Sequence, residues 1–164
     1  MKLFDTNGDG FIAGAELDKA PGLKGALKPK LDANGDGKLA ADEISARLQK
    51  YLDSKVAVVT CRCSVTLDGM PIEGATIKLV PEPFLATLLP AVATTDKQGV
   101  GTAQAQGTDL PGVNPGIYRV EISKVIGGKE TLPARYNAET TLGGEIASDL
   151  DSLSEGLGFS LKSN

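Results

Sequence analysis

The sequence predicts two domains of different fold class, an all-α segment over residues 1–54 and an all-β sandwich over residues 55–164. Three observations lead to this expectation. A twelve-residue, oxygen-rich loop occurs twice near the start of the chain. Near Asp53, the spacing of apolar residues changes from the helical period of about 3.6 to the strand period of 2. Beyond that point, short apolar runs are separated by turns rich in Gly and Pro.

Composition limits the functions that the chain can have. The 164 residues include 20 Gly and only 4% aromatic residues, which suits short strands and tight turns. The net charge is −4 and no basic stripe exists, so nucleic acid is a poor candidate partner. Histidine is absent, which excludes Ser-His-Asp and Cys-His catalysis within this chain and disfavours zinc. The sequence shows no apolar run that could span a bilayer and no secretory signal, and we expect a trimmed natural N-terminus.

The first loop, DTNGDGFIAGAE at residues 5–16, spaces oxygen donors as a calcium ion requires. Calcium binds six to eight oxygens in a flexible cage, and a twelve-residue loop can supply them from fixed positions. Gly10 permits the positive φ that the sharp turn in such a loop needs. The expected ligands of the first site are Asp5, Asn7, Asp9, the carbonyl oxygen of Phe11, and Glu16.

The second loop, DANGDGKLAADE at residues 32–43, has seven of its twelve residues in common with the first. The expected ligands of the second site are Asp32, Asn34, Asp36, the carbonyl oxygen of Lys38, and Glu43. Ile12 and Leu39 occupy the eighth positions, and we expect them to form a short two-stranded contact between the loops. Alanine occupies the ninth position of both loops, which leaves one vertex to water and predicts moderate affinity. The sequence therefore predicts two Ca²⁺ sites.

The two loops resemble those of the EF-hand family over residues 1–53. The resemblance implies an all-α EF-hand pair whose first hand is truncated, because only four residues precede Asp5. Neither Met lies in an expected helix of this pair, so calcium is expected to stabilise the fold rather than to expose a Met-rich groove as in sensors. Loops followed by single helices also occur in dockerin-type modules, which bind a partner protein, and this leaves a docking module as an alternative.

Alternating residues mark the strands of the second segment. Residues 59–67 place Val59, Cys61, Cys63, Val65 and Leu67 on one face. Residues 117–122 place Ile117, Arg119 and Glu121 on one face and Tyr118, Val120 and Ile122 on the other. The two cysteines are expected as buried thiols, with a redox or metal role as the alternative. Residues 81–92, PEPFLATLLPAV, predict a loop or one-turn helix, or an apolar patch for a partner or for the N-terminal segment.

An ordered set of turn motifs resembles the transthyretin-like (prealbumin-like), carboxypeptidase-regulatory-like sandwich, a family widespread in bacterial envelope proteins. The motifs are Asp68-Gly69-x-Pro71-x-x-Gly74-Ala75, Thr95-Asp96-x-x-Gly99 and Pro115-Gly116-x-Tyr118-x-Val120. The resemblance implies a transthyretin-like β-sandwich over residues 55–164. It also implies an extracytoplasmic location, in the periplasm, on the cell surface or secreted.

These expectations combine into a non-catalytic, calcium-binding extracytoplasmic module. Calcium would stabilise the helical domain, and the sandwich would be a scaffold or would bind a protein or glycan. No nucleic-acid partner and no membrane span are expected. The alternatives are a dockerin-like docking module and an enzyme with structural calcium. Such an enzyme would use carboxylates such as Glu121 and Glu139, although no spacing in the sequence pairs them.

Overall fold

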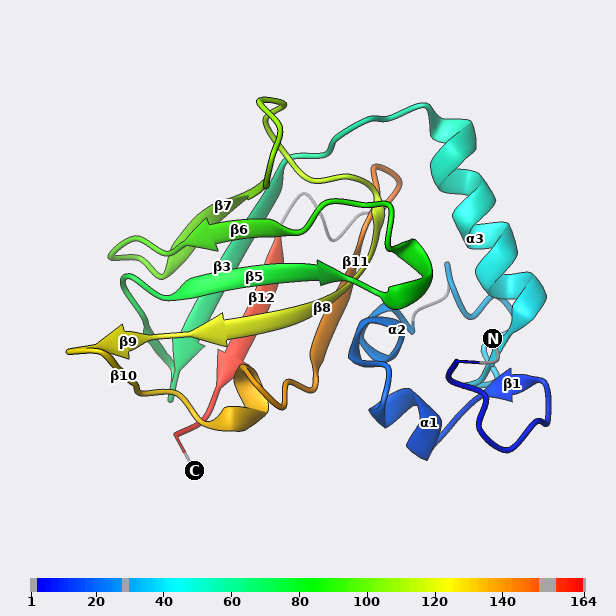
Figure 1. Cartoon of the computed structure of the whole chain (residues 1–164), viewed down its shortest axis with the longest axis horizontal. Helices are drawn as coiled ribbons and strands as arrows, with labels where there is room; N and C mark the ends of the chain where they lie inside the picture. Colours follow the sequence, from blue (N-terminus) through cyan, green and yellow to red (C-terminus); the bar gives the residue numbers. More distant parts are fainter. Residues whose placement is uncertain (1–2, 28–29, 151–155, 164) are drawn as a thin grey trace.

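In the part of the chain that the structure describes, residues 3–27, 30–150 and 156–163, a curled β-sheet of eight strands dominates and three α-helices lie to one side (Figure 1). The structure is a computed structural model. The strands of the sheet are β3 (Cys61–Leu67), β4 (Met70–Pro71), β5 (Thr76–Pro81), β6 (Ala91–Thr94), β7 (Val100–Ala105), β8 (Gly116–Ser123), β11 (Leu142–Ile146) and β12 (Leu157–Leu161). Their order in space is β11-β8-β5-β6-β7-β3-β12, with β4 beside β3. Strand β12 is parallel to β3, and the other neighbours are antiparallel.

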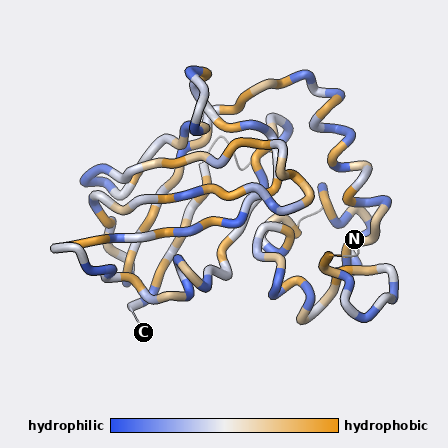
Figure 2. Tube along the Cα trace, viewed as in Figure 1, coloured by the Kyte–Doolittle hydropathy of each residue, from blue (hydrophilic) through white to orange (hydrophobic). Residues whose placement is uncertain are grey.

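The main apolar core is formed by one face of nearly every strand in the sheet. In β3, Cys61, Cys63 and Val65 are buried while Arg62 and Ser64 are exposed, as the alternation predicts. Strands β5 and β7 alternate in the same way, and Figure 2 shows hydrophobic and hydrophilic stretches interspersed in the β segment. Residues of β5 and β12, which are far apart in the strand order, belong to the same buried cluster, so the sheet must curl around it.

The turns follow the glycine signals of the sequence. Asp68 and Gly69 both have positive φ, 52° and 84°, in the tight turn from β3 to β4. Between β6 and β7, the Gly99 amide donates to the Asp96 carbonyl oxygen at 2.9 Å. The Asp96 side chain accepts from the Val100 amide at 3.0 Å, which ends the turn where β7 begins.

The expected all-α EF-hand pair is wrong. The N-terminal elements are β1 (Phe11–Ile12), α1 (Ala15–Asp18), α2 (Pro21–Ala26), β2 (Leu39–Ala40) and α3 (Ala41–Ser54). Among the described residues no helix precedes the first loop, and the helix after it has four residues, so two helix–loop–helix units are not formed. Pro21 explains the short helices, since proline fits the first turn of α2 but cannot continue α1.

The expected transthyretin-like β-sandwich is also wrong. The strands form one curled sheet in a continuous order instead of two sheets packed face to face. Strand β6 pairs with β5 on one side and with β7 on the other, which joins the two halves of the β segment. Alternation predicts the buried face of each strand, but it carries no information about which strands are neighbours.

Strand β8 is buried on both faces at its start, where Ile117 and Tyr118 are both fully buried. Tyr118, Val120 and Ile122 belong to the core of the sheet, whereas Ile117 belongs to a second apolar cluster. The other buried members of this second cluster come from the N-terminal segment: Phe4, Ile12, Leu17, Ala20, Leu23, Ala26, Leu31, Leu39 and Ile44. The N-terminal segment therefore packs against the face of the sheet opposite to the main core.

The proline-rich segment 81–92 contributes to the same contact. It contains one 3₁₀ turn, η1 (Pro83–Leu85), whose Phe84 and Leu85 pack against the second cluster. The Phe84 ring meets the Phe4 ring edge to face, with centroids 6.3 Å apart. The expected one-turn helix is therefore present. The expected contact of this segment's apolar side chains with the N-terminal segment is present as well.

The expected boundary between residues 54 and 55 coincides with the end of α3. Lys55 follows this helix in a left-handed conformation, with φ 53°. The segments on both sides of it pack as a single-domain-like body, and the division into domains 1–54 and 55–164 stays a prediction.

The smaller elements lie at the periphery of the sheet without belonging to it. Strands β9 (Val125–Ile126) and β10 (Lys129–Glu130) form a hairpin beyond β8, and η2 (Ala134–Tyr136) is a second 3₁₀ turn.

Cys61 and Cys63 are free thiols, and both are buried, as expected from the alternation in β3. Their sulfur atoms lie 3.8 Å apart.

Helix α2 lies directly on β11 through glycine. A Cβ atom added to Gly25 would collide with the carbonyl group of Gly143, and one added to Gly143 would collide with the carbonyl group of Pro21. These are contacts with main-chain atoms, so a methyl group could be accommodated only by moving the helix away from the strand.

We expect Gly25→Ala to lower the free energy of unfolding by about 1–3 kcal/mol, because overpacking outweighs the better helix propensity of Ala, worth about 1 kcal/mol. The midpoint of urea denaturation measures this change. Gly158→Ala is the matched control, since its methyl group would meet Ser64 Oγ at an ordinary 3.5 Å. A Gly25→Ala variant as stable as the control would contradict the close packing of α2 on β11.

Candidate metal centre

The first loop is organised by hydrogen bonds to its first aspartate. Asp5 Oδ1 accepts from the Gly8 amide at 2.7 Å, and Asp5 Oδ2 accepts from the Gly10 amide at 3.1 Å. Gly10 has φ 88°, as its place in the turn requires. Asn7 Oδ1 accepts from the Asp9 amide at 2.8 Å, which turns the chain back towards the centre of the loop.

Glu16 closes the first loop from its far end. Its Oε1 accepts from the Thr6 amide at 2.7 Å and from the Asn7 amide at 3.2 Å, and its Oε2 accepts from the Ala13 amide at 3.3 Å. The hydrogen bond from the Thr6 amide is the main reason why the pKa of Glu16 lies below its ordinary value. Glu16 is therefore a charged carboxylate at neutral pH, as a metal ligand must be.

The carboxylates of the first loop fit a hard cation. Asp5, Asp9 and Glu16 each place one oxygen atom within 4.8 Å of the others. A carboxylate has about four lone-pair positions, and Asp5 uses two of them for the amides of its own loop, so acceptor capacity remains. Oxygen donors of this kind suit calcium and magnesium better than zinc.

The second loop repeats these hydrogen bonds. Asp32 accepts from the Gly35 amide at 2.7 Å and from the Gly37 amide at 2.9 Å. Glu43 accepts from the Ala33 amide and the Ala40 amide, both at 3.0 Å. The same local geometry therefore arises twice from the residues that the two loops share.

The two loops differ at their second position. In the first loop, the Thr6 hydroxyl donates to Glu16 Oε1 at 3.0 Å, whereas Ala33 in the second loop has no hydroxyl to donate to Glu43. Among the described residues, the three carboxylates of the second loop are not gathered as closely as those of the first. The carboxylates of the second loop are thus more widely spaced, and Glu43 has one hydrogen bond fewer of the kind that Thr6 gives Glu16.

A short antiparallel pair connects the loops. Ile12 in β1 pairs with Leu39 in β2, and both side chains are fully buried, which confirms the contact expected between the eighth positions. The ammonium group of Lys38 lies 5.4 Å from the centre of the Phe11 ring, so the seventh positions also meet. The assignment of the Phe11 and Lys38 carbonyl oxygens as ligands stays a prediction.

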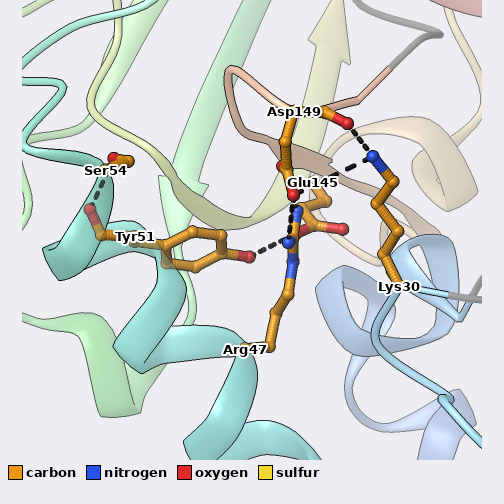
Figure 3. Close-up of polar contacts among 6 residues, drawn as sticks. All are labelled: Lys30, Arg47, Tyr51, Ser54, Glu145 and Asp149. Atoms are coloured by element: carbon orange, nitrogen blue, oxygen red, sulfur yellow. Dashed lines mark hydrogen bonds and ion pairs between the residues drawn. The ribbon is translucent and has the colours of Figure 1, made fainter.

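A buried ionic network links α3 to the end of β11 (Figure 3). Arg47 is 1% exposed; its Nε donates to Glu145 Oε1, and its two terminal nitrogens each donate to Asp149 at 2.7 Å. The Tyr51 hydroxyl donates to the same Glu145 oxygen at 2.5 Å. Within the described chain, Glu145 Oε2 is buried without a hydrogen-bond partner.

Arg47 and Asp149 are both charged at neutral pH. Burial by itself lowers the pKa of Arg47, but the hydrogen bonds to Asp149 and Glu145 outweigh it and raise the pKa overall. The hydrogen bond from Arg47 holds the pKa of Asp149 below its ordinary value. The apolar spacing of Ile44 and Leu48 places Arg47 on the inner side of α3 and could have indicated its burial, but nothing in the sequence pairs it with residues about a hundred positions away.

Comparison of the chain with protein-family models, with curated proteins and with solved structures finds no match. The structure lacks two helix–loop–helix units and has one curled sheet, so the expected membership of the EF-hand and transthyretin-like families is wrong. The descriptions of the chain as an EF-hand, carboxypeptidase-regulatory-like or envelope-family protein that followed from it are wrong as well. Among the described residues, no helix has the length and apolar character needed to cross a membrane.

Removing the charge of Arg47 should destabilise the protein, because the carboxylate of Glu145 would stay buried without a cation. We expect Arg47→Met to lower the free energy of unfolding by about 3–5 kcal/mol, because Glu145 stays buried without its cation, and Arg47→Met/Glu145→Leu to recover much of that loss. Urea denaturation measures both. Lys24→Met, which removes an exposed ion pair with Asp18, is the control and should cost at most about 1 kcal/mol. Equal losses for Arg47→Met and the control would contradict this description of the network.

Stability should fall at alkaline pH because two tyrosines are buried. Burial raises the pKa of Tyr51 and of Tyr118 above the ordinary value of 10.0. The folded state therefore keeps protons that the unfolded state loses, so stability is fully present below pH 10.0 and declines as the pH rises above it. In Tyr51→Phe, the decline should be shallower by up to about 1.4 kcal/mol per pH unit in urea denaturation. An unchanged slope would show that Tyr51 ionises freely in the folded protein.

Proposed function

We propose that residues 5–16 and 32–43 are two calcium-binding loops, and that the bound ions stabilise the N-terminal segment against the curled sheet. The observation that carries this proposal is the repetition of one hydrogen-bonded carboxylate geometry in two loops that are joined through Ile12 and Leu39. The expected ligands are Asp5, Asn7, Asp9, Phe11 and Glu16 in the first loop, and Asp32, Asn34, Asp36, Lys38 and Glu43 in the second.

The donor set favours calcium over other common metal ions. Every expected ligand atom is oxygen, and the chain has no histidine. Magnesium prefers a tighter octahedron that retains several waters, whereas calcium accepts the larger number of protein oxygens that a twelve-residue loop provides. Each expected ligand lies within its own twelve residues, and the last ligand of each loop lies in the first turn of the helix that follows, Glu16 in α1 and Glu43 in α3.

Bound calcium would act on stability rather than on chemistry. The α1 and α2 helices have four and six residues, too few to be stable without the contacts that surround them. An ion at a concentration of about 100 times its dissociation constant stabilises the folded state by about 2.7 kcal/mol per site. Since the second apolar cluster joins this segment to β8, stabilising the loops would also stabilise the contact with the sheet.

The setting that we propose for this function is extracytoplasmic, with the sheet as a non-catalytic scaffold. Loops with three carboxylates and one vertex left to water suit a moderate affinity, weaker than that of cytosolic calcium buffers, and such an affinity is useful where calcium is abundant. Glu121, considered as a catalytic carboxylate, is bound to Arg119 at 2.7 Å and lies near Lys78 at 3.5 Å on the surface of the sheet, which supports a structural role for it.

Calcium titration by calorimetry, combined with thermal unfolding, tests the proposal. We expect two binding events in the unaltered protein and the loss of one event in each of Glu16→Gln and Glu43→Gln. In saturating calcium, each variant should melt about 5–10 °C below the unaltered protein, which corresponds to the loss of about 2.7 kcal/mol.

Glu139→Gln is the control for these substitutions, because Glu139 is an exposed glutamate outside both loops. It should bind two ions and melt like the unaltered protein. In excess chelator, the difference in melting temperature between the loop variants and the control should shrink to the part that comes from the amide hydrogen bonds that Gln cannot accept. Two intact binding events in both loop variants would rule out the ligand assignment.

A further inference from the structure

Both ends of the second loop converge on one carboxylate beside the sheet. Asp149 lies three residues beyond the end of β11 at Ile146, and it binds the guanidinium group of Arg47 through both of its oxygens. The Lys30 ammonium lies 3.9 Å from Asp149 Oδ2 and also donates to the Asp149 carbonyl oxygen. Figure 3 shows Lys30 and Arg47 reaching Asp149 from separate parts of the chain. We call these three residues the Asp149 clasp.

Two residues of the clasp, Lys30 and Arg47, flank the second loop in the sequence. Lys30 is two residues before Asp32, the first expected ligand, and Arg47 is four residues after Glu43, the last. Four residues correspond to about one turn of α3, so Glu43 and Arg47 lie on the same side of this helix. Among the ion pairs of the described residues, none connects the ends of the first loop to the sheet. The Lys24–Asp18 pair, which follows the first loop, lies entirely within the N-terminal segment.

We propose that Asp149 is a positioning residue for calcium binding by the second loop, acting through Lys30 and Arg47; this rests on the function proposed above for that loop. A loop with fixed ends has already lost part of the conformational freedom that ion binding would remove, so it binds the ion more tightly. The effect is reciprocal: an ion in the second loop stabilises the clasp, and with it the contact between α3 and the end of β11.

The clasp offsets a weakness of the second loop. This loop lacks the hydroxyl that supports Glu16 in the first loop, and its three carboxylates are gathered less closely in the described structure. Glu43 keeps its hydrogen bonds from the Ala33 and Ala40 amides, and the anchoring of α3 by Arg47 one turn further on adds a support from outside the loop. The first site thus has the additional hydroxyl within its loop, and the second has an additional support on the sheet.

A purely electrostatic effect of the clasp predicts a different pattern. Asp149 carries a negative charge that attracts a cation, whereas Lys30 carries a positive charge that repels it. If charge alone acted, removing Lys30 would tighten calcium binding. If positioning acts, removing Lys30 weakens it, just as removing the Asp149 charge does.

Calcium titration of the full chain, followed by amide NMR, separates the two loops. The Gly10 and Gly37 amides each donate to the first aspartate of their own loop, at 3.1 Å and 2.9 Å, so each reports on one site. We expect Asp149→Asn and Lys30→Gln each to raise the half-saturating calcium concentration at Gly37 by about fivefold, a modest coupling, and to leave that at Gly10 unchanged. Asp109→Asn, at an exposed aspartate outside the clasp, should change neither.

The outcomes distinguish this inference from the proposal on which it rests. If neither amide responds to calcium in the unaltered chain, the calcium function itself fails. If both respond, but Lys30→Gln tightens binding at Gly37 or both variants leave it unchanged, positioning by Asp149 is overturned. Equal weakening of the two loops would show a general loss of structure and would overturn it as well. Lys30 is exposed, and melting in chelator checks that its substitution leaves the fold intact.

Discussion

The buried guanidinium group of Arg47, which is bound by the carboxylates of Glu145 and Asp149, determines how α3 is placed against the sheet. Arg47 is almost fully buried, and a buried guanidinium group is tolerated only where its hydrogen bonds are satisfied. Glu145 and Asp149 satisfy them from one short stretch at the end of β11. A shift of α3 by one turn would separate Arg47 from Glu145 and leave two buried charges without partners. The network therefore specifies the register of α3, whatever its net contribution to stability.

Apolar packing supplies the attraction that the ionic network directs. Strand β8 presents Tyr118 to the core of the sheet and Ile117 to the cluster of the N-terminal segment, so the start of this strand is covered on both faces. Close approach of α2 to β11 is possible because Gly25 and Gly143 have no side chains at the contact. The short helices of the N-terminal segment thus owe their order to the sheet, to each other through β1 and β2, and, as proposed, to calcium.

The two loops show how one local pattern acquires two different supports. Their shared residues produce the same hydrogen bonds within each loop, since every donor and acceptor lies within eleven positions. The difference between Thr6 and Ala33 weakens the local support of Glu43, while Lys30 and Arg47 connect the second loop to Asp149. A duplicated motif can therefore become unequal through contacts that lie outside it.

The sequence by itself determined the features that depend on neighbours in the chain. Alternation in residues 59–67 predicted which side chains are buried, and glycine with aspartate predicted the turns at Gly69 and Gly99. The positive φ of Gly10 and the contact of Ile12 with Leu39 also followed from the spacing within the loops. These features are local because the hydrogen bonds and periodicities behind them extend over only a few residues.

The tertiary structure alone decided which segments are neighbours. It joined the strands into one curled sheet instead of a sandwich, and it placed β12 parallel to β3 from a distant part of the chain. It also brought Arg47 to Asp149, 102 positions away. Which segments become neighbours depends on how the whole chain buries its apolar faces and pairs its buried charges. The spacing of residues within a short stretch of sequence carries no information about either.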